Sequence, residues 1–73
     1  MSATAGTGEV TVNGDLIPLP ESTTIGALLE RLGVKPVRVV VELNGTIYRR
    51  GEGLDREVRA GDVVEIVHFV GGG

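Results

Sequence analysis

The sequence contains no cysteine and a single histidine, His68. Without cysteine the chain cannot form a disulfide bridge, a thiolate metal site, a thiol nucleophile or a persulfide of its own. A single imidazole also disfavours a multi-histidine metal site and a Ser-His-Asp triad. We therefore expect no catalytic residue and no bound metal in this chain, and we expect its stability to come from packing.

Aromatic and basic residues are scarce as well. The chain has one tyrosine and one phenylalanine, and its seven basic residues are outnumbered by ten acidic ones, which gives a net charge of −3. Proteins that recognise nucleic acid need a basic surface, often with aromatic side chains on which bases stack. We therefore expect no nucleic-acid partner.

Long apolar runs are also missing. No stretch of the sequence approaches the length that is needed to cross a bilayer. Residues 1–8 are small and polar, and they lack the basic start and the apolar centre of a secretory signal. These absences predict a cytoplasmic protein without a membrane partner.

Apolar residues nevertheless make up 41% of the 73 residues, which is enough for a compact core. A chain of this length is expected to form one small domain. We predict a flexible N-terminal leader at residues 1–8, a folded domain at residues 9–70 and a flexible glycine-rich tail at residues 71–73.

Several segments have the alternation and the β-branched residues that are typical of strands. They are residues 9–12, 15–19, 37–43, 46–49 and 63–69. Asn13-Gly14 and Asn44-Gly45 each join two of these segments. Both pairs favour a two-residue hairpin, because its type I′ turn needs positive φ at both positions. Pro18 lacks an N–H group, which predicts that its strand lies at a sheet edge.

One helix is predicted over residues 24–32. Its apolar residues recur at helical spacing and form one stripe, which consists of Ile25, Leu28, Leu29 and Leu32. Ser22 or Thr23 is expected to cap the N-terminus of the helix. Gly33 is expected to end the helix in the left-handed conformation.

The predicted order is hairpin, helix, hairpin, a turn of 3₁₀ helix at residues 54–58, and a final strand. A helix and a sheet bury their apolar surfaces by packing on each other. We therefore predict an α+β fold of the β-grasp (ubiquitin-like) type, with a mixed five-stranded sheet and one main helix on one face. The first and last strands are expected to run parallel in the middle of the sheet. The last strand is nearly all apolar, which predicts cover on much of both faces.

Glycines follow the last predicted strand, as Gly71, Gly72 and Gly73. Glycine has no Cβ atom, so this segment can adopt extended or positive-φ conformations without a clash. We predict that Gly71 and Gly72 thread into a partner's active site and present the carboxylate of Gly73 there. The alternative is a frayed end without a function, and the tail alone does not decide between the two.

Taken with this tail, several segments resemble the ThiS family of bacterial sulfur carriers in thiamin biosynthesis, which is related to the small subunit of molybdopterin synthase. The segments are Val12 to Gly14, Thr24 to Leu29, Val39 to Gly45, Ile47 to Arg50, Gly61 to Val67 and Val70 to Gly73. The resemblance covers residues 9–73. Its most specific part is the combination of β-grasp order with the C-terminal glycines.

The resemblance implies a carrier rather than an enzyme. In this family an E1-like adenylating enzyme of the ThiF type consumes ATP and Mg²⁺ to activate the terminal carboxylate, here that of Gly73. Sulfur from a cysteine desulfurase or another donor then forms a thiocarboxylate, which passes sulfur to thiazole synthase of the ThiG type. The carrier itself is expected to bind no cofactor and to be a monomer when free.

Apolar residues near the tail predict a surface on which a partner docks. They are Val67, Phe69, Val70 and Tyr48, with Val40 and Val63 expected beside them. If Val64 and Ile66 contact the helix, alternation places Val67 and Phe69 on the open face of the sheet, where an exposed apolar patch marks a binding surface. Cover by loops or by a second carrier is the alternative. His68 is expected to be structural or solvated, because that is the more frequent role of a lone strand histidine.

Other functions remain open at this point. The chain could carry sulfur for molybdopterin, for tRNA thiolation or for cysteine synthesis. It could also be a ubiquitin-like protein modifier or a simple interaction module, since a glycine tail is compatible with each of these roles.

Overall fold

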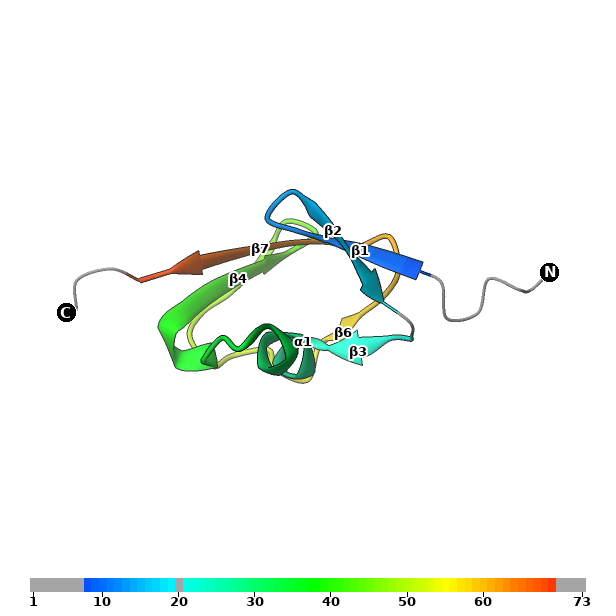
Figure 1. Cartoon of the computed structure of the whole chain (residues 1–73). Helices are drawn as coiled ribbons and strands as arrows, with labels where there is room; N and C mark the ends of the chain where they lie inside the picture. Colours follow the sequence, from blue (N-terminus) through cyan, green and yellow to red (C-terminus); the bar gives the residue numbers. More distant parts are fainter. Residues whose placement is uncertain (1–7, 20, 70–73) are drawn as a thin grey trace.

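The computed structural model describes residues 8–19 and 21–69. These residues form two sheets, one α-helix and one 3₁₀ helix (Figure 1). In chain order the elements are β1 (Gly8–Val12), β2 (Asp15–Leu19), β3 (Thr23–Thr24), α1 (Ile25–Leu32), η2 (Pro36–Arg38), β4 (Val39–Leu43), β5 (Thr46–Tyr48), β6 (Glu57–Val58) and β7 (Val63–His68).

The larger sheet has five strands in the order β2-β1-β7-β4-β5. Strands β1 and β7 are parallel, and the other neighbouring strands are antiparallel. The predicted mixed β-grasp sheet, with its first and last strands parallel near the centre, is therefore confirmed. Strand β2 lies at an edge, as its proline indicated.

Both predicted Asn-Gly hairpins are present. Asn13 and Gly14 have φ angles of 49° and 87°, and Asn44 and Gly45 have φ angles of 50° and 90°. These are the two successive positive φ angles that a type I′ turn requires. Each turn pairs the residues on its two sides directly, so it sets the register of its hairpin.

The helix α1 begins one residue later than predicted. Its N-cap is Thr24, whose Oγ1 accepts a hydrogen bond from the Ala27 N–H at 3.1 Å. A cap at Ser22 or Thr23 is therefore wrong, because Thr23 is occupied in β3, where it pairs with Val58 of β6. The C-terminal prediction is confirmed, since Gly33 has a φ angle of 74°.

Two other predicted elements differ in the structure. Residues 36–38 form the 3₁₀ helix η2, because the Arg38 N–H donates to the Lys35 carbonyl at 2.9 Å, and β4 starts only after it. Residues 54–58 were expected to form a 3₁₀ turn. Instead, Glu57–Val58 pair with β3 in a second, two-stranded sheet, which buries Val58 completely.

The core lies between the larger sheet and a second layer that contains α1, β3 and β6 (Figure 1). This layer covers one face of the sheet. Val64 and Ile66 of β7 are buried beneath it, whereas Val63 and Val67 are exposed. The expectation that β7 is covered on both faces is therefore wrong. Leu32 of the predicted stripe is also exposed at the end of α1.

Within the described residues no helix has the length and the apolar character needed to cross a membrane. Most of the predicted leader and all of the predicted tail fall outside the described residues. Strand β1 includes Gly8, the last residue of the predicted leader.

Candidate functional site

Strand β7 leads from the centre of the sheet toward the predicted sulfur-carrying end. It pairs with β4 as far as His68, which is opposite Val39. One residue later, the Phe69 N–H donates to the Arg38 carbonyl at 3.0 Å. The chain is therefore attached to β4, and then to the last residue of η2, up to its last described residue. The predicted sites at Val70, Gly71, Gly72 and Gly73 lie outside the described residues.

The open face of the larger sheet carries the predicted apolar side chains. Val67 is 59% exposed and lies opposite Val40 on β4. Phe69 is 51% exposed and continues the same alternation after β7. The predicted position of Val67 and Phe69, on the face opposite to the helix, is confirmed.

Two further apolar residues on this face were not predicted. Ile47 of β5 is 61% exposed and lies opposite Glu42, and Leu16 of β2 is 66% exposed and lies opposite Thr11. The sequence contains a signal for both, because each lies within a strand of a hairpin whose two-residue turn sets the register.

Tyr48 does not belong to this face, which corrects the sequence prediction. It lies opposite Val41, a buried residue on the helix side, and packs against the core. The Arg56 guanidinium carbon lies 5.9 Å from the centroid of its ring. A Cβ atom at Gly53 would collide with the same ring. Tyr48 is therefore a structural residue on the covered face.

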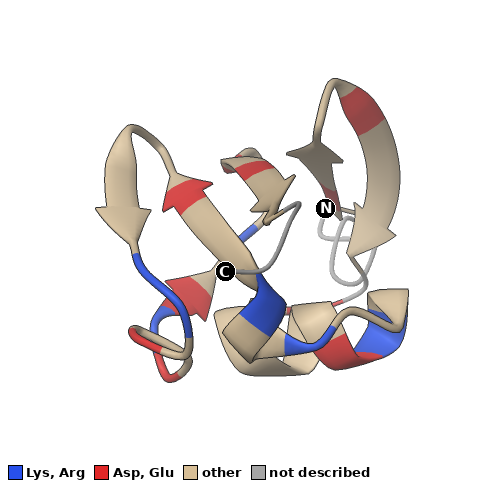
Figure 2. Ribbon diagram, turned by 90° about the vertical axis from the view of Figure 1, so that its left-hand side faces the viewer, with Lys and Arg blue, Asp and Glu red and all other residues tan. Residues whose placement is uncertain are grey.

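Charged residues lie among the apolar ones on the open face. Glu42 of β4 and Glu65 of β7 are direct cross-strand partners, and Figure 2 shows an acidic band on each of these neighbouring strands. At the C-terminal end of the face, the Arg50 guanidinium carbon lies 4.9 Å from the centroid of the Phe69 ring. A cation over an aromatic ring is attracted by the ring's quadrupole, so Arg50 covers one side of Phe69.

The described residues form one salt bridge, and it lies outside this face. Arg59 Nη2 is 2.8 Å from Glu57 Oε1, next to the small sheet. The hydrogen bond from Arg59 and its positive charge lower the pKa of Glu57 below its ordinary value. Both side chains are well exposed, so this pair is a feature of the solvated surface.

The asparagines of the two hairpin turns hold β7 in place. The Asn13 side chain hydrogen-bonds both the N–H and the carbonyl of Ile66, and Asn44 Oδ1 accepts from the Val63 N–H at 2.9 Å. Asn44 also donates from Nδ2 to Asp62 Oδ1 at 3.1 Å. The Asn-Gly signal predicted the turns but not these long-range contacts, which position the strand that leads to the tail.

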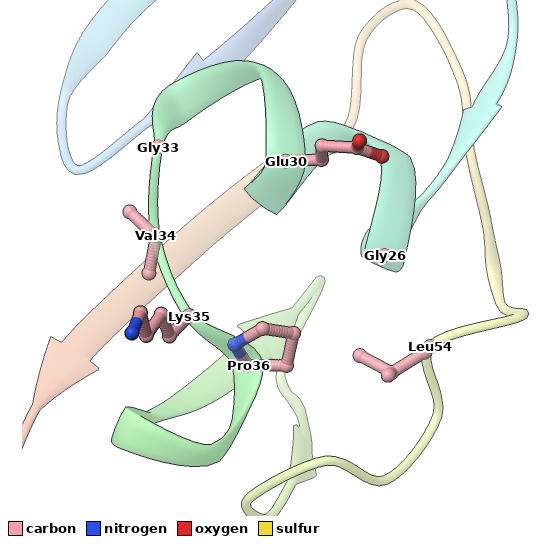
Figure 3. Close-up of a pocket in the computed structure, with 7 residues that line it drawn as sticks. All are labelled: Gly26, Glu30, Gly33, Val34, Lys35, Pro36 and Leu54. Atoms are coloured by element: carbon pink, nitrogen blue, oxygen red, sulfur yellow. The ribbon is translucent and has the colours of Figure 1, made fainter.

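A cavity of about 400 Å³ lies on the opposite, helix-bearing side (Figure 3). It is mostly apolar, and the residues around it include Gly26, Glu30, Val34, Lys35, Pro36 and Leu54. Within the described residues no group of three or more His, Asp or Glu side chains is placed to hold a metal ion.

His68 is exposed at the end of β7, opposite Val39. The fold therefore places it near the C-terminal end of the sheet, but on the side of the buried Val39 rather than with Val67. The structural or solvated role that the sequence suggested for His68 stays a prediction.

Comparison with known proteins gives consistent matches. A family model described as the ThiS family matches residues 9–73. The sulfur carrier protein ThiS of Thermus thermophilus is 42% identical over 64 residues, which are 88% of this chain and 98% of that protein. The crystal structure of the thiamine biosynthesis protein (ThiS) from Geobacter metallireducens matches with a TM-score of 0.72 and 38% identity, covering 89% of this chain and 99% of that one.

A longer relative is similar over the same part of the chain. Thiazole synthase of Magnetococcus marinus is 35% identical over 65 residues, which are 89% of this chain but 20% of that protein. The chain therefore spans about a fifth of the length of this relative.

Proposed function

The chain belongs to the ThiS family, and on that ground we propose that it carries sulfur for the synthesis of the thiazole part of thiamin. The observation that carries this proposal is the match over 98% of a sulfur carrier protein at 42% identity. As a member of this family the chain is a carrier, on which enzymes act, and not itself a catalyst.

The proposed chemistry takes place at the carboxylate of Gly73. An α-carboxyl group has a pKa of about 3.5 and is ionised in the cell, which makes it a poor electrophile. One of its oxygens attacks the α-phosphorus of ATP, pyrophosphate leaves, and an acyl adenylate forms. A sulfur nucleophile then attacks the acyl carbon and AMP leaves. If the nucleophile is the terminal sulfur of a donor persulfide, the product is an acyl disulfide. A thiol then attacks the donor's sulfur of this S–S bond, so a thiocarboxylate leaves on Gly73 and the donor and the thiol are joined in a disulfide.

Gly71 and Gly72 fit this chemistry because they lack side chains. A partner that acts on the last carboxylate has to accommodate the residues before it in a narrow channel, which a Cβ atom would obstruct. We propose that these two residues thread into the active site of each partner.

The proposed partners follow from the order of these steps. An E1-like enzyme of the ThiF type performs the adenylation and holds the ATP and the Mg²⁺, which neutralises phosphate charge. A cysteine desulfurase or another donor supplies the sulfur. Thiazole synthase of the ThiG type accepts it, which is supported by the relative of that name that contains a similar segment. We propose that these steps take place in the cytoplasm, with the free carrier as a monomer.

We propose that the open face near the tail docks the adenylating enzyme through Val67, Phe69 and Val70. The exposure of Val67 and Phe69 supports this, because an apolar surface is stabilised when a partner removes it from water. Both residues lie close in sequence to Gly73, so a partner that binds them also lies near the carboxylate.

The test is the intact mass of the protein after incubation with an adenylating enzyme of the ThiF type, Mg·ATP and a sulfur source. We expect a gain equal to the replacement of one oxygen by sulfur, and no gain in a control variant that lacks Gly72 and Gly73. Loss of this added mass in the presence of thiazole synthase would identify the pathway. A bond between Gly73 and a lysine of another protein would instead indicate a protein modifier.

A further inference from the structure

Two glutamates lie at the centre of the open face, on the neighbouring strands β4 and β7. Glu42 of β4 and Glu65 of β7 are paired residue to residue in the antiparallel register. Their Cβ atoms are therefore about 4.5–5.5 Å apart and their side chains leave the same face. Within the described part of the chain, neither carboxylate forms a salt bridge.

This pair is costly for the isolated protein. Like charges directly opposite each other on a sheet destabilise it, and β positions at the centre of a sheet favour β-branched or aromatic residues. The next cross-strand pair on the same face, Val40 with Val67, follows that preference. The β propensity of this position and its cross-strand pairing therefore do not favour two carboxylates here.

Apolar side chains surround the pair on the same face. Val67 and Val40 lie toward the tail, Val63 lies toward the start of β7, and Ile47 lies beside Glu42 on β5. A partner that covers these apolar residues also covers the glutamates. Burial of unpaired carboxylates is strongly unfavourable, so we expect such a partner to supply positive charge at this point.

We propose that the adenylating enzyme places a lysine or arginine side chain between Glu42 and Glu65, and that this contact helps it to recognise the carrier. The inference rests on the proposed function. Arginine fits the site well, because its guanidinium group can bind carboxylates through paired N–H donors while its aliphatic stem packs on the neighbouring valines. Adenylation precedes every other step, so this enzyme is the first that has to find the carrier in solution.

The charged residues make the two ends of the open face different. The acidic pair lies at its centre, and Arg50 lies over Phe69 at the end from which the chain continues to the tail. A partner with complementary charges is favoured in one orientation, because the reversed orientation would leave Arg50 without its acidic counterpart. A second copy of the carrier that met this face at the glutamates would bring four carboxylates together, which disfavours a dimer of that kind.

The test is a double substitution, Glu42→Gln with Glu65→Gln, which keeps the shape of the side chains. The control is Glu21→Gln with Glu30→Gln, which removes the same charge from exposed positions away from the open face, Glu30 lying on α1. Carrier-dependent release of pyrophosphate by the adenylating enzyme gives KM and kcat for each protein. Equal net charge in the two variants separates a local contact from general electrostatic steering.

We expect the open-face variant to raise KM for the carrier about tenfold or more, with kcat unchanged. The control should stay within about twofold of the wild type, which is what loss of exposed charges produces. The dependence of KM on salt should also be weaker in the open-face variant, because a charged contact has been removed. The same variant should unfold at an equal or higher temperature than the wild type, so its weaker binding is not a result of misfolding.

Equal KM values for the two double variants would overturn the inference and leave the proposed function intact. A KM effect that appears only with thiazole synthase would also overturn it, and so would a wild-type dimer that dissociates in the open-face variant. If an enzyme that adenylates a known ThiS does not adenylate the wild-type chain, the proposed function fails and the inference fails with it.

Discussion

The side chain of Asn13 hydrogen-bonds both backbone polar groups of Ile66. Its Oδ1 accepts from the Ile66 N–H at 2.7 Å, and its Nδ2 donates to the Ile66 carbonyl at 3.2 Å. Strand β1 pairs with β7 at Thr11 and Val12, and the Asn13 N–H then donates to the Val64 carbonyl at 2.9 Å. Asn13 therefore continues the pairing of β7 after the backbone of β1 has turned away, and it supports the strand that leads toward Gly73.

Substitution of Asn13 tests this support. Asn13→Gly keeps the positive φ angle without strain but removes both hydrogen bonds, and we expect it to lower the free energy of unfolding by about 1–3 kcal/mol. Urea denaturation measures this difference. Equal stability of Asn13→Gly and the wild type would show that the two bonds contribute nothing.

Gly51 and Gly53 have similar φ angles, so alanine substitutions at the two positions distinguish the cost of backbone strain from the cost of a steric clash. Gly51 and Gly53 have φ angles of 70° and 67°, but only at Gly53 would a Cβ atom collide with Tyr48. At Gly51 the nearest atom is Val37 Cγ1 at 3.8 Å. We expect Gly51→Ala to cost about 1–2 kcal/mol and Gly53→Ala about 2–4 kcal/mol, by urea denaturation. Equal costs would contradict the close packing of Tyr48.

Phe69 and Tyr48 should give opposite phenotypes. Phe69→Asp places a charge on the open face, so we expect KM for the carrier in adenylation to rise at least about tenfold, with little change in stability. Tyr48→Ser removes a ring that packs on the core, so we expect lower stability and a smaller effect on KM. Adenylation kinetics and thermal unfolding of the two variants check this. An unchanged KM in a folded Phe69→Asp variant would remove Phe69 from the docking surface.

The Glu57–Arg59 pair predicts a small dependence of stability on pH. Its hydrogen bond with Arg59 gives Glu57 a lower pKa in the folded chain than the ordinary value of 4.5. The pair therefore adds stability above that value, and this contribution is lost as the pH falls through the folded pKa. We expect Glu57→Gln to be slightly less stable than the wild type at neutral pH and equal to it in strong acid. A difference that grows on acidification would contradict this.

Much of the fold was predictable because its signals are local. An Asn-Gly pair favours positive φ angles through its own two residues, so both hairpins could be predicted from four residues. Gly33 ends the helix for the same kind of reason. The position of Tyr48 was predictable too, because a two-residue turn at Asn44-Gly45 places Tyr48 opposite Val41, which alternation directs to the core.

The remaining features depend on residues that are far apart in the sequence. The cap at Thr24 follows from the pairing of Thr23 with Val58, and two-residue strands have no alternation that a sequence can reveal. The pairing of the two hairpins with β7 likewise decides which residues face each other on the open face.

The sequence by itself determined the two hairpins, the main helix, the final strand and the family resemblance, since these follow from periodicity, turn chemistry and shared motifs. Only the tertiary structure decided that Glu42 lies opposite Glu65 and that Asn13 holds Ile66. The physical reason is that register between distant strands is set by how all the side chains of the core pack together. That packing is a property of the whole domain and of no single segment.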